Sequence, residues 1–162
     1  MSGIYIRNII FGVADSLVST VGLLSGVNIS GTPRATIILT GVVYAFVEAF
    51  SMAVGSFLSE QSIEEYEAKK ETPNKKPFLG GTVMFFSFVT ASFIPITPYF
   101  ILNPSTALWL SIVLSIGALF FVGIIIAKIS HTHPFQHGLK MTLLGGAAIL
   151  IGVLVGKVLR IG

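Results

Sequence analysis

The chain has 162 residues, of which 53% are hydrophobic and 10% are charged, and its mean hydropathy is +0.89. Soluble domains carry about 25% charged residues, so this composition excludes an ordinary soluble protein and indicates a chain embedded in a lipid bilayer. The net charge of +3 is better explained by membrane topology than by nucleic-acid binding, and the absence of cysteine excludes disulfides and thiolate ligands.

Five apolar segments are long enough to cross a bilayer, since one span needs about 20 residues. They lie near residues 4–27, 34–58, 78–102, 105–127 and 138–159. The sequence therefore predicts an all-α membrane protein with a single transmembrane domain over residues 1–162.

The distribution of basic residues indicates the orientation of these spans. Seven lysines and arginines fall on the side of the N-terminus, and three fall on the opposite side. Because cytosolic segments are enriched in these residues, we expect a cytosolic N-terminus and a C-terminus on the far side. The first group is Arg7, Lys69, Lys70, Lys75, Lys76, Lys128 and Lys140, and the second is Arg34, Lys157 and Arg160.

The only strongly polar segment covers residues 60–76. We expect the second helix to continue into it as far as about residue 71, with Pro73 ending the helix. Four glutamates would then share one helix face and attract cations to a cytosolic entrance. The alternative is a solvated helix end balanced by the neighbouring lysines. The four glutamates are Glu60, Glu64, Glu67 and Glu71.

Two acids, Asp15 and Glu48, lie deep within apolar segments. A carboxylate at the bilayer centre costs at least about 2.5–3.5 kcal/mol, so such residues usually mark a pathway for ions or protons. Each acid is about 10 or 11 residues from the cytosolic end of its span, which places both roughly 15–17 Å deep at 1.5 Å per residue. Antiparallel helices would bring the two carboxylates to one level.

Small and polar residues recur beside both acids at helical spacing. In the second helix, Met52 follows Glu48 by one turn, and its thioether would shift the preference of a carboxylate site toward transition-metal ions. The first face is Asn8, Gly12, Asp15, Ser19, Gly22 and Gly26. The second face is Gly41, Tyr44, Glu48, Ser51 or Met52, Gly55 and Ser59.

Three histidines, His131, His133 and His137, fall in one short segment and are candidates for metal binding or proton relay. Their spacing matches no closed structural site, and Pro134 prevents a continuous helix face. There is no ATP-binding loop and no hydrolase or metalloprotease motif. We therefore expect neither an enzyme nor a resident cofactor.

Two segments resemble the vacuolar iron transporter family: residues 6–19, IRNIIFGVADSLVS, and residues 48–59, EAFSMAVGSFLS. The resemblance implies a homodimer that moves Fe²⁺, and often Mn²⁺, out of the cytosol in exchange for protons. By resemblance, Asp15 matches the pore aspartate and Met52 matches the pore methionine.

The chain departs from the family pattern at several positions. Asn8 replaces an aspartate, Ser16 replaces a glycine, and Tyr44 stands where a glutamate is usual. Glu48, one turn closer to Met52, is a candidate replacement for that glutamate. Residues 60–76 are also too few for the cytosolic metal-binding domain of the family's vacuolar members.

We therefore predict a homodimeric exporter of Fe²⁺ or Mn²⁺, since five helices without an internal repeat are few to enclose a pathway. Asp15, Glu48 and Met52 would line the pore, and the further candidate ligands are Asn8, Tyr44 and Ser19. The alternatives are a membrane-structural protein whose acids serve helix packing, and a transporter of protons or another cation. The short form favours a prokaryotic plasma membrane over a vacuole-type membrane.

Overall fold

The computed structural model of the protein describes residues 3–71, 73 and 75–158. It contains five helices: α1 (Gly3–Ile29), α2 (Arg34–Ala68), α3 (Lys75–Ile101), α4 (Pro104–Ile129) and α5 (Pro134–Val158). Each is long and apolar enough to cross a membrane, and the described residues form no strand. The predicted class of all-α membrane protein with five spans is confirmed. Residue 159, the predicted end of the fifth span, and Arg160 lie outside the described residues.

Proline and glycine define several helix boundaries. Pro104 and Pro134 are the first residues of α4 and α5, where a missing N–H and a fixed φ are tolerated. Pro33 directly precedes α2, and Gly31 adopts a φ of +87° in the turn before it. These residues end one span and start the next within a few positions, so the connections are short.

The second helix is the longest, with 35 residues. It ends earlier than we expected, because Lys69 adopts the left-handed conformation (φ 51°) that typically terminates a helix. Glu71 therefore lies beyond the helix and not on its face.

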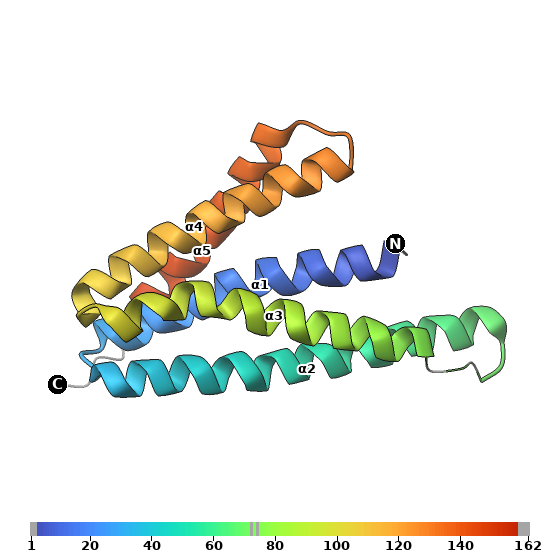
Figure 1. The fold of residues 1–162 in the computed structure, drawn as a ribbon, viewed down its shortest axis with the longest axis horizontal. Coiled ribbons are helices and arrows are strands. Elements are labelled where there is room, and N and C mark those ends of the chain that lie inside the picture. The colour runs from blue at the N-terminus through green and yellow to red at the C-terminus, as the bar shows by residue number, and fades with distance from the viewer. Residues whose placement is uncertain (1–2, 72, 74, 159–162) are drawn as a thin grey trace.

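The first helix is central to the bundle. It packs mainly against α3 and α5 and also contacts α2 and α4, whereas α2 packs mainly on α3 and, less extensively, on α1. Figure 1 shows α1, α2 and α3 running side by side, with α4 and α5 forming a hairpin that diverges from the start of α1. Much of α2 and α5 is consequently left uncovered in the single chain.

Glycines allow α1 and α5 to approach at backbone distance. Gly152 faces the backbone of Gly22, and Gly156 faces the backbone of Gly26. A Cβ at Gly26 would lie only 2.8 Å from the carbonyl oxygen of Gly152. The two GxxxG segments of the sequence therefore pack against each other, as small residues do in membrane helices.

Buried hydroxyls join α1 to α3. Ser16 is fully buried, donates a 2.8 Å hydrogen bond to the carbonyl oxygen of Phe88 and lies 2.7 Å from the Ser92 hydroxyl. Ser16 occupies the position where the resemblance leads us to expect a glycine. Ser16 therefore contributes to the packing of α1 against α3, because its hydroxyl forms an interhelical hydrogen bond.

Candidate functional site

The two intramembrane acids come together in the structure. Asp15 on α1 and Glu48 on α2 are close enough for their charges to interact, and both side chains are partly exposed in the single chain. Ser19, one turn along from Asp15, donates a 2.7 Å hydrogen bond to the carbonyl oxygen of Asp15. Its hydroxyl also faces the phenol of Tyr44, which is within electrostatic reach of both acids. Four candidate residues thus form one polar group, which we call the acid pair site: Asp15, Glu48, Tyr44 and Ser19.

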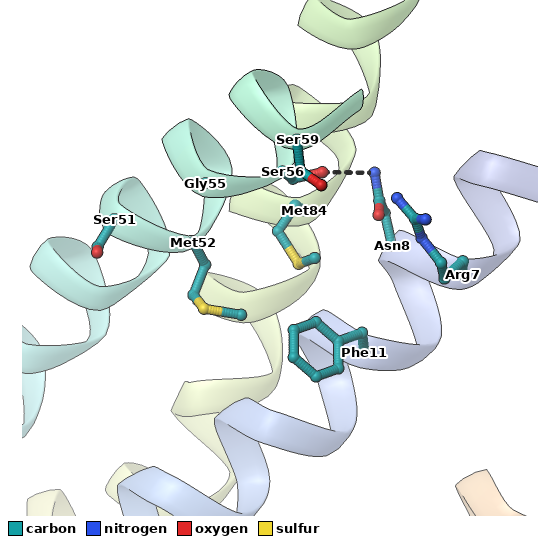
Figure 2. Close-up of a pocket in the computed structure, with 9 residues that line it drawn as sticks. All are labelled: Arg7, Asn8, Phe11, Ser51, Met52, Gly55, Ser56, Ser59 and Met84. Carbon is teal, nitrogen blue, oxygen red and sulfur yellow. Dashed lines mark hydrogen bonds between the residues drawn. The ribbon is translucent and has the colours of Figure 1, made fainter. Parts of the chain in front are cut away.

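A cavity of about 590 Å³ opens between α1, α2 and α3, toward the end of the bundle at which α1 begins. Figure 2 shows the side chains of Met52 on α2 and Met84 on α3 at this cavity, with Asn8 on the α1 side. Met52 follows Glu48 by one turn of α2, so the cavity adjoins the acid pair site without including its carboxylates. Ser56, Ser59 and Arg7 also line it. We call this space the methionine cavity.

A hydrogen-bond network closes one side of the methionine cavity. The amide nitrogen of Asn8 donates to the Ser56 hydroxyl and to Oε1 of Glu60, both at 2.9 Å. Arg7 forms an ion pair with the same Glu60 oxygen at 2.8 Å. Glu60 is only 4% exposed, and its second oxygen occupies the space that a Cβ at Gly80 would need. Asn8 therefore acts as a donor between helices, with its amide nitrogen engaged in hydrogen bonds.

The sequence predicts that Glu60 shares one helix face with other glutamates at a cytosolic entrance, but in the structure Glu60 is buried. Since α2 still packs against α1 and α3 at this level, the Glu60 side chain points into the bundle. Glu64 and Glu67 instead line a surface hollow together with Lys75 and Lys76. Glu71 is exposed beyond the end of α2. The arrangement fits the alternative of a solvated helix end balanced by lysines.

Sequence reasoning missed Met84, which is 3% exposed and belongs to α3. Gly12 on α1 leaves room for it, because a Cβ at Gly12 would lie 3.1 Å from the Met84 sulfur. The available signal was a second methionine at a similar distance from the same end of the bundle as Met52. Only the packing of α3 against α1 shows that the two sulfurs border one cavity.

The described part of the chain does not gather the three histidines into a group placed to hold a metal ion. His131 and His133 are exposed and His137 is partly exposed in and after the α4–α5 turn. Within residues 3–71, 73 and 75–158, no group of three or more His, Cys, Asp or Glu side chains is placed to hold a metal ion. The acid pair likewise contributes only two carboxylates from a single chain.

The fold and the site together define an integral membrane protein with intramembrane carboxylates, a class in which such residues mark ion or proton pathways. The sequence profile of the VIT family matches residues 6–75 and 64–157. The chain belongs to this family, as its two resembling segments indicate. Members of the family are membrane metal-ion transporters and not enzymes.

A similar protein is known from the archaeon Methanocaldococcus jannaschii, where it is described as uncharacterized. It is 27% identical to this chain over 164 residues, covering 90% of this chain and 84% of its own length. The likeness therefore extends over most of the chain.

Proposed function

We propose that the protein transports Fe²⁺ or Mn²⁺ out of the cytosol in exchange for protons. The observation that supports the proposal is that Asp15 and Glu48, on two different apolar helices, are near enough for their charges to interact. Carboxylate oxygens bind divalent cations, and the adjoining Met52 thioether favours transition-metal ions over Mg²⁺ and Ca²⁺. With the N-terminus in the cytosol, as the distribution of basic residues predicts, the methionine cavity also lies on the cytosolic side of the membrane. The membrane would be a prokaryotic plasma membrane, with a vacuole-type membrane as the alternative.

A homodimer would complete the site. The edge of α2 beside Glu48 is open in the single chain: Ser51 and Ser59 are exposed, and a Cβ at Gly55 would meet no atom within 4 Å. A second copy related by a two-fold axis, packed on this edge, would add another Asp15 and Glu48 to the same pathway. Four carboxylates and two thioethers would then surround one ion.

Proton exchange follows from the chemistry of the ligands. Carboxylates must be deprotonated to bind a metal ion, so ion binding and protonation compete at the same oxygens. A proton arriving from the far side would release the ion there. Asp15 and Glu48 of both copies are the residues that would carry these protons.

The test is the uptake of Fe²⁺ and Mn²⁺ into liposomes containing the purified protein, with an imposed pH gradient. We expect Asp15→Asn and Glu48→Gln each to reduce the flux to near that of protein-free liposomes. Glu65→Gln is the matched control, since it removes a partly exposed acid that belongs neither to the acid pair site nor to the four candidate entrance glutamates, and it should leave the flux unchanged. Equal flux with and without Asp15 would reject the assignment.

The rival function is a membrane-structural role in which the acids hydrogen-bond between helices. The position of the Ser19 and Tyr44 hydroxyls beside the acids favours this alternative. It predicts that Glu48→Gln preserves the assembled protein and that purified protein binds no Fe²⁺ or Mn²⁺. Proton flux without metal flux in the same liposomes would instead indicate a transporter of protons.

A further inference from the structure

A groove between α2 and α3 is lined mainly by aromatic side chains. Its volume of about 360 Å³ falls within the range of ligand sites, which is roughly 300–1,000 Å³. Gly81 allows the two helices to approach closely here, because an added Cβ would lie 2.7 Å from the carbonyl oxygen of Ala53. The groove is open to the surroundings of the bundle, since Phe50 and Phe78 are 65% and 69% exposed. The phenylalanines that line it are Phe50, Phe57, Phe78 and Phe85.

A charged hollow of about 750 Å³ lies at the end of the same helix pair, where α3 begins (Figure 1). Lys75 and Lys76 border it from α3, and Glu64 and Glu67 border it from α2. Among the described residues, neither lysine forms an ion pair with these glutamates. The hollow therefore offers two positive and two negative charges to a ligand.

The hollow and the groove follow one face of the helix pair. On α2, Glu64 follows Phe57 by seven residues, which is two helical turns. On α3, Phe78 and Thr82 follow Lys75 by three and seven residues, again on one helix face. A ligand in the hollow would therefore continue directly into the groove, with its polar part among the charges and its apolar part among the phenylalanines.

The depths of these residues match the layers of a phospholipid. Lys75 precedes the apolar segment that begins near residue 78 by three residues, or about 5 Å along a helix. Glu64 lies six residues beyond the apolar segment that ends near residue 58, or about 9 Å. Because the headgroup layer is about 5–7 Å thick, Lys75 lies at the level of the lipid phosphates and Glu64 lies slightly farther from the hydrocarbon.

Phosphatidylethanolamine carries its charges in this order, since its phosphate is next to the glycerol and its ammonium is at the outer end. We propose that the hollow and the groove together bind one phosphatidylethanolamine molecule. Its phosphate contacts Lys75 and Lys76, its ammonium contacts Glu64 and Glu67, and one acyl chain packs against the phenylalanines.

The headgroup chemistry separates this lipid from two others. A primary ammonium donates hydrogen bonds to carboxylates, which the quaternary ammonium of phosphatidylcholine cannot do. The anionic headgroup of phosphatidylglycerol has no positive charge for Glu64 and Glu67, and their carboxylates oppose its binding. The site is separate from the acid pair site, and the inference does not depend on the transported ion.

The experiment measures lipid binding to the purified full chain by native mass spectrometry. Phosphatidylethanolamine, phosphatidylcholine and phosphatidylglycerol with identical acyl chains are offered in equal amounts. We expect the protein to retain phosphatidylethanolamine in preference to both others. The double variant Glu64→Gln, Glu67→Gln should lose the preference over phosphatidylglycerol, because the carboxylates that favour an ammonium and oppose an anionic headgroup are then absent.

A lysine substitution tests the contact with the phosphate. Lys75→Gln should weaken phosphatidylethanolamine binding by about fivefold, the effect of one basic residue at an anionic lipid group. Lys128→Gln is the matched control, since it removes an exposed lysine at the end of α4, on the same predicted side of the membrane. It should leave the binding unchanged.

A threonine pair tests the groove. Thr82 lines the groove and Thr97 lies elsewhere on α3, and each hydroxyl donates a hydrogen bond to a carbonyl oxygen one turn earlier in the same helix. Thr82→Phe should fill the groove and reduce phosphatidylethanolamine binding, whereas Thr97→Phe should not.

Equal retention of the three lipids, or equal losses in Lys75→Gln and Lys128→Gln, would overturn the proposed site. The same spectra report the oligomeric state. If Thr82→Phe converted a dimer to a monomer and left lipid retention unchanged, the groove would be covered by a second copy of the chain, which would also overturn the proposal. Neither result depends on the liposome flux, so failure of the proposed function remains distinguishable.

Discussion

The amide nitrogen of Asn8 lies 2.9 Å from Oε1 of Glu60, joining the start of α1 to the end of α2. The resemblance leads us to expect an aspartate at position 8. An aspartate at position 8 would place a second carboxylate within hydrogen-bonding distance of the Glu60 carboxylate. The Asn8 amide instead donates a hydrogen bond to Glu60. Asn8 and Glu60 are thus a matched pair, and Arg7 completes their charge balance.

We predict that Asn8→Asp lowers stability, because it replaces a buried donor with a charge that repels Glu60. The loss should be about 2 kcal/mol, in line with the cost of leaving a buried hydrogen-bonding group unsatisfied. The change is measured as the thermal unfolding midpoint in detergent, which should fall by several degrees. Added Mn²⁺ should restore the midpoint, because a cation can lie between the two carboxylates.

Asn8→Ala is the control for that experiment. It also removes the hydrogen bonds to Ser56 and Glu60 but adds no carboxylate. Its midpoint should fall, and Mn²⁺ should raise it no more than it raises that of the unmodified protein, in which the acid pair site is also present. Equal recovery of both variants would show that Mn²⁺ acts elsewhere in the protein.

The glycine contact between α1 and α5 predicts that substituting alanine for two glycines of α5 will change the stability of the protein differently. Gly152→Ala would place a Cβ against the carbonyl oxygen of Gly22, and we expect overpacking to cost about 1–3 kcal/mol. Gly146 has no atom within 4 Å of an added Cβ, so Gly146→Ala should be neutral or stabilise by up to about 1 kcal/mol through helix propensity. Thermal unfolding in detergent checks both variants. Equal midpoints would contradict the close approach of α1 and α5.

Arg34 should hold the last turn of α3 in place. Its Nε atom donates a 2.6 Å hydrogen bond to the carbonyl oxygen of Tyr99, and its Nη2 atom donates to that of Phe100. These carbonyls lie at the end of α3, where the last C=O groups of a helix have no N–H donor within the helix. We expect Arg34→Ala to cost about 1.5–3 kcal/mol, the range for hydrogen bonds to a charged group.

Hydrogen exchange of the amides from Tyr99 to Ala107 measures this effect locally. Exchange should accelerate in Arg34→Ala and stay unchanged in Thr36→Ala, which alters an exposed side chain on the same first turn of α2. Similar exchange in the two variants would mean that the end of α3 is held by other contacts, such as the 2.7 Å hydrogen bond from Asn28 to Pro104.

Much of the fold follows from local properties of the sequence. The five spans could be predicted because each is a long apolar segment bounded by Gly, Pro or charged residues. Asp15 and Glu48 could be identified because a carboxylate within such a segment is costly. The end of α2 was less predictable, since Lys69 has no intrinsic preference for the left-handed conformation that stops the helix.

The sequence by itself determined the membrane class, the number of spans and the two intramembrane acids, because hydropathy and the cost of a buried charge depend on neighbouring residues along the chain. Only the tertiary structure decided that Glu60 points inward to Asn8 and Arg7, and that Met84 joins Met52 at one cavity. These pairings depend on how α1, α2 and α3 are rotated and crossed. That geometry arises from side-chain packing between helices, including the space left by Gly12 and Gly80, and no helix specifies it alone.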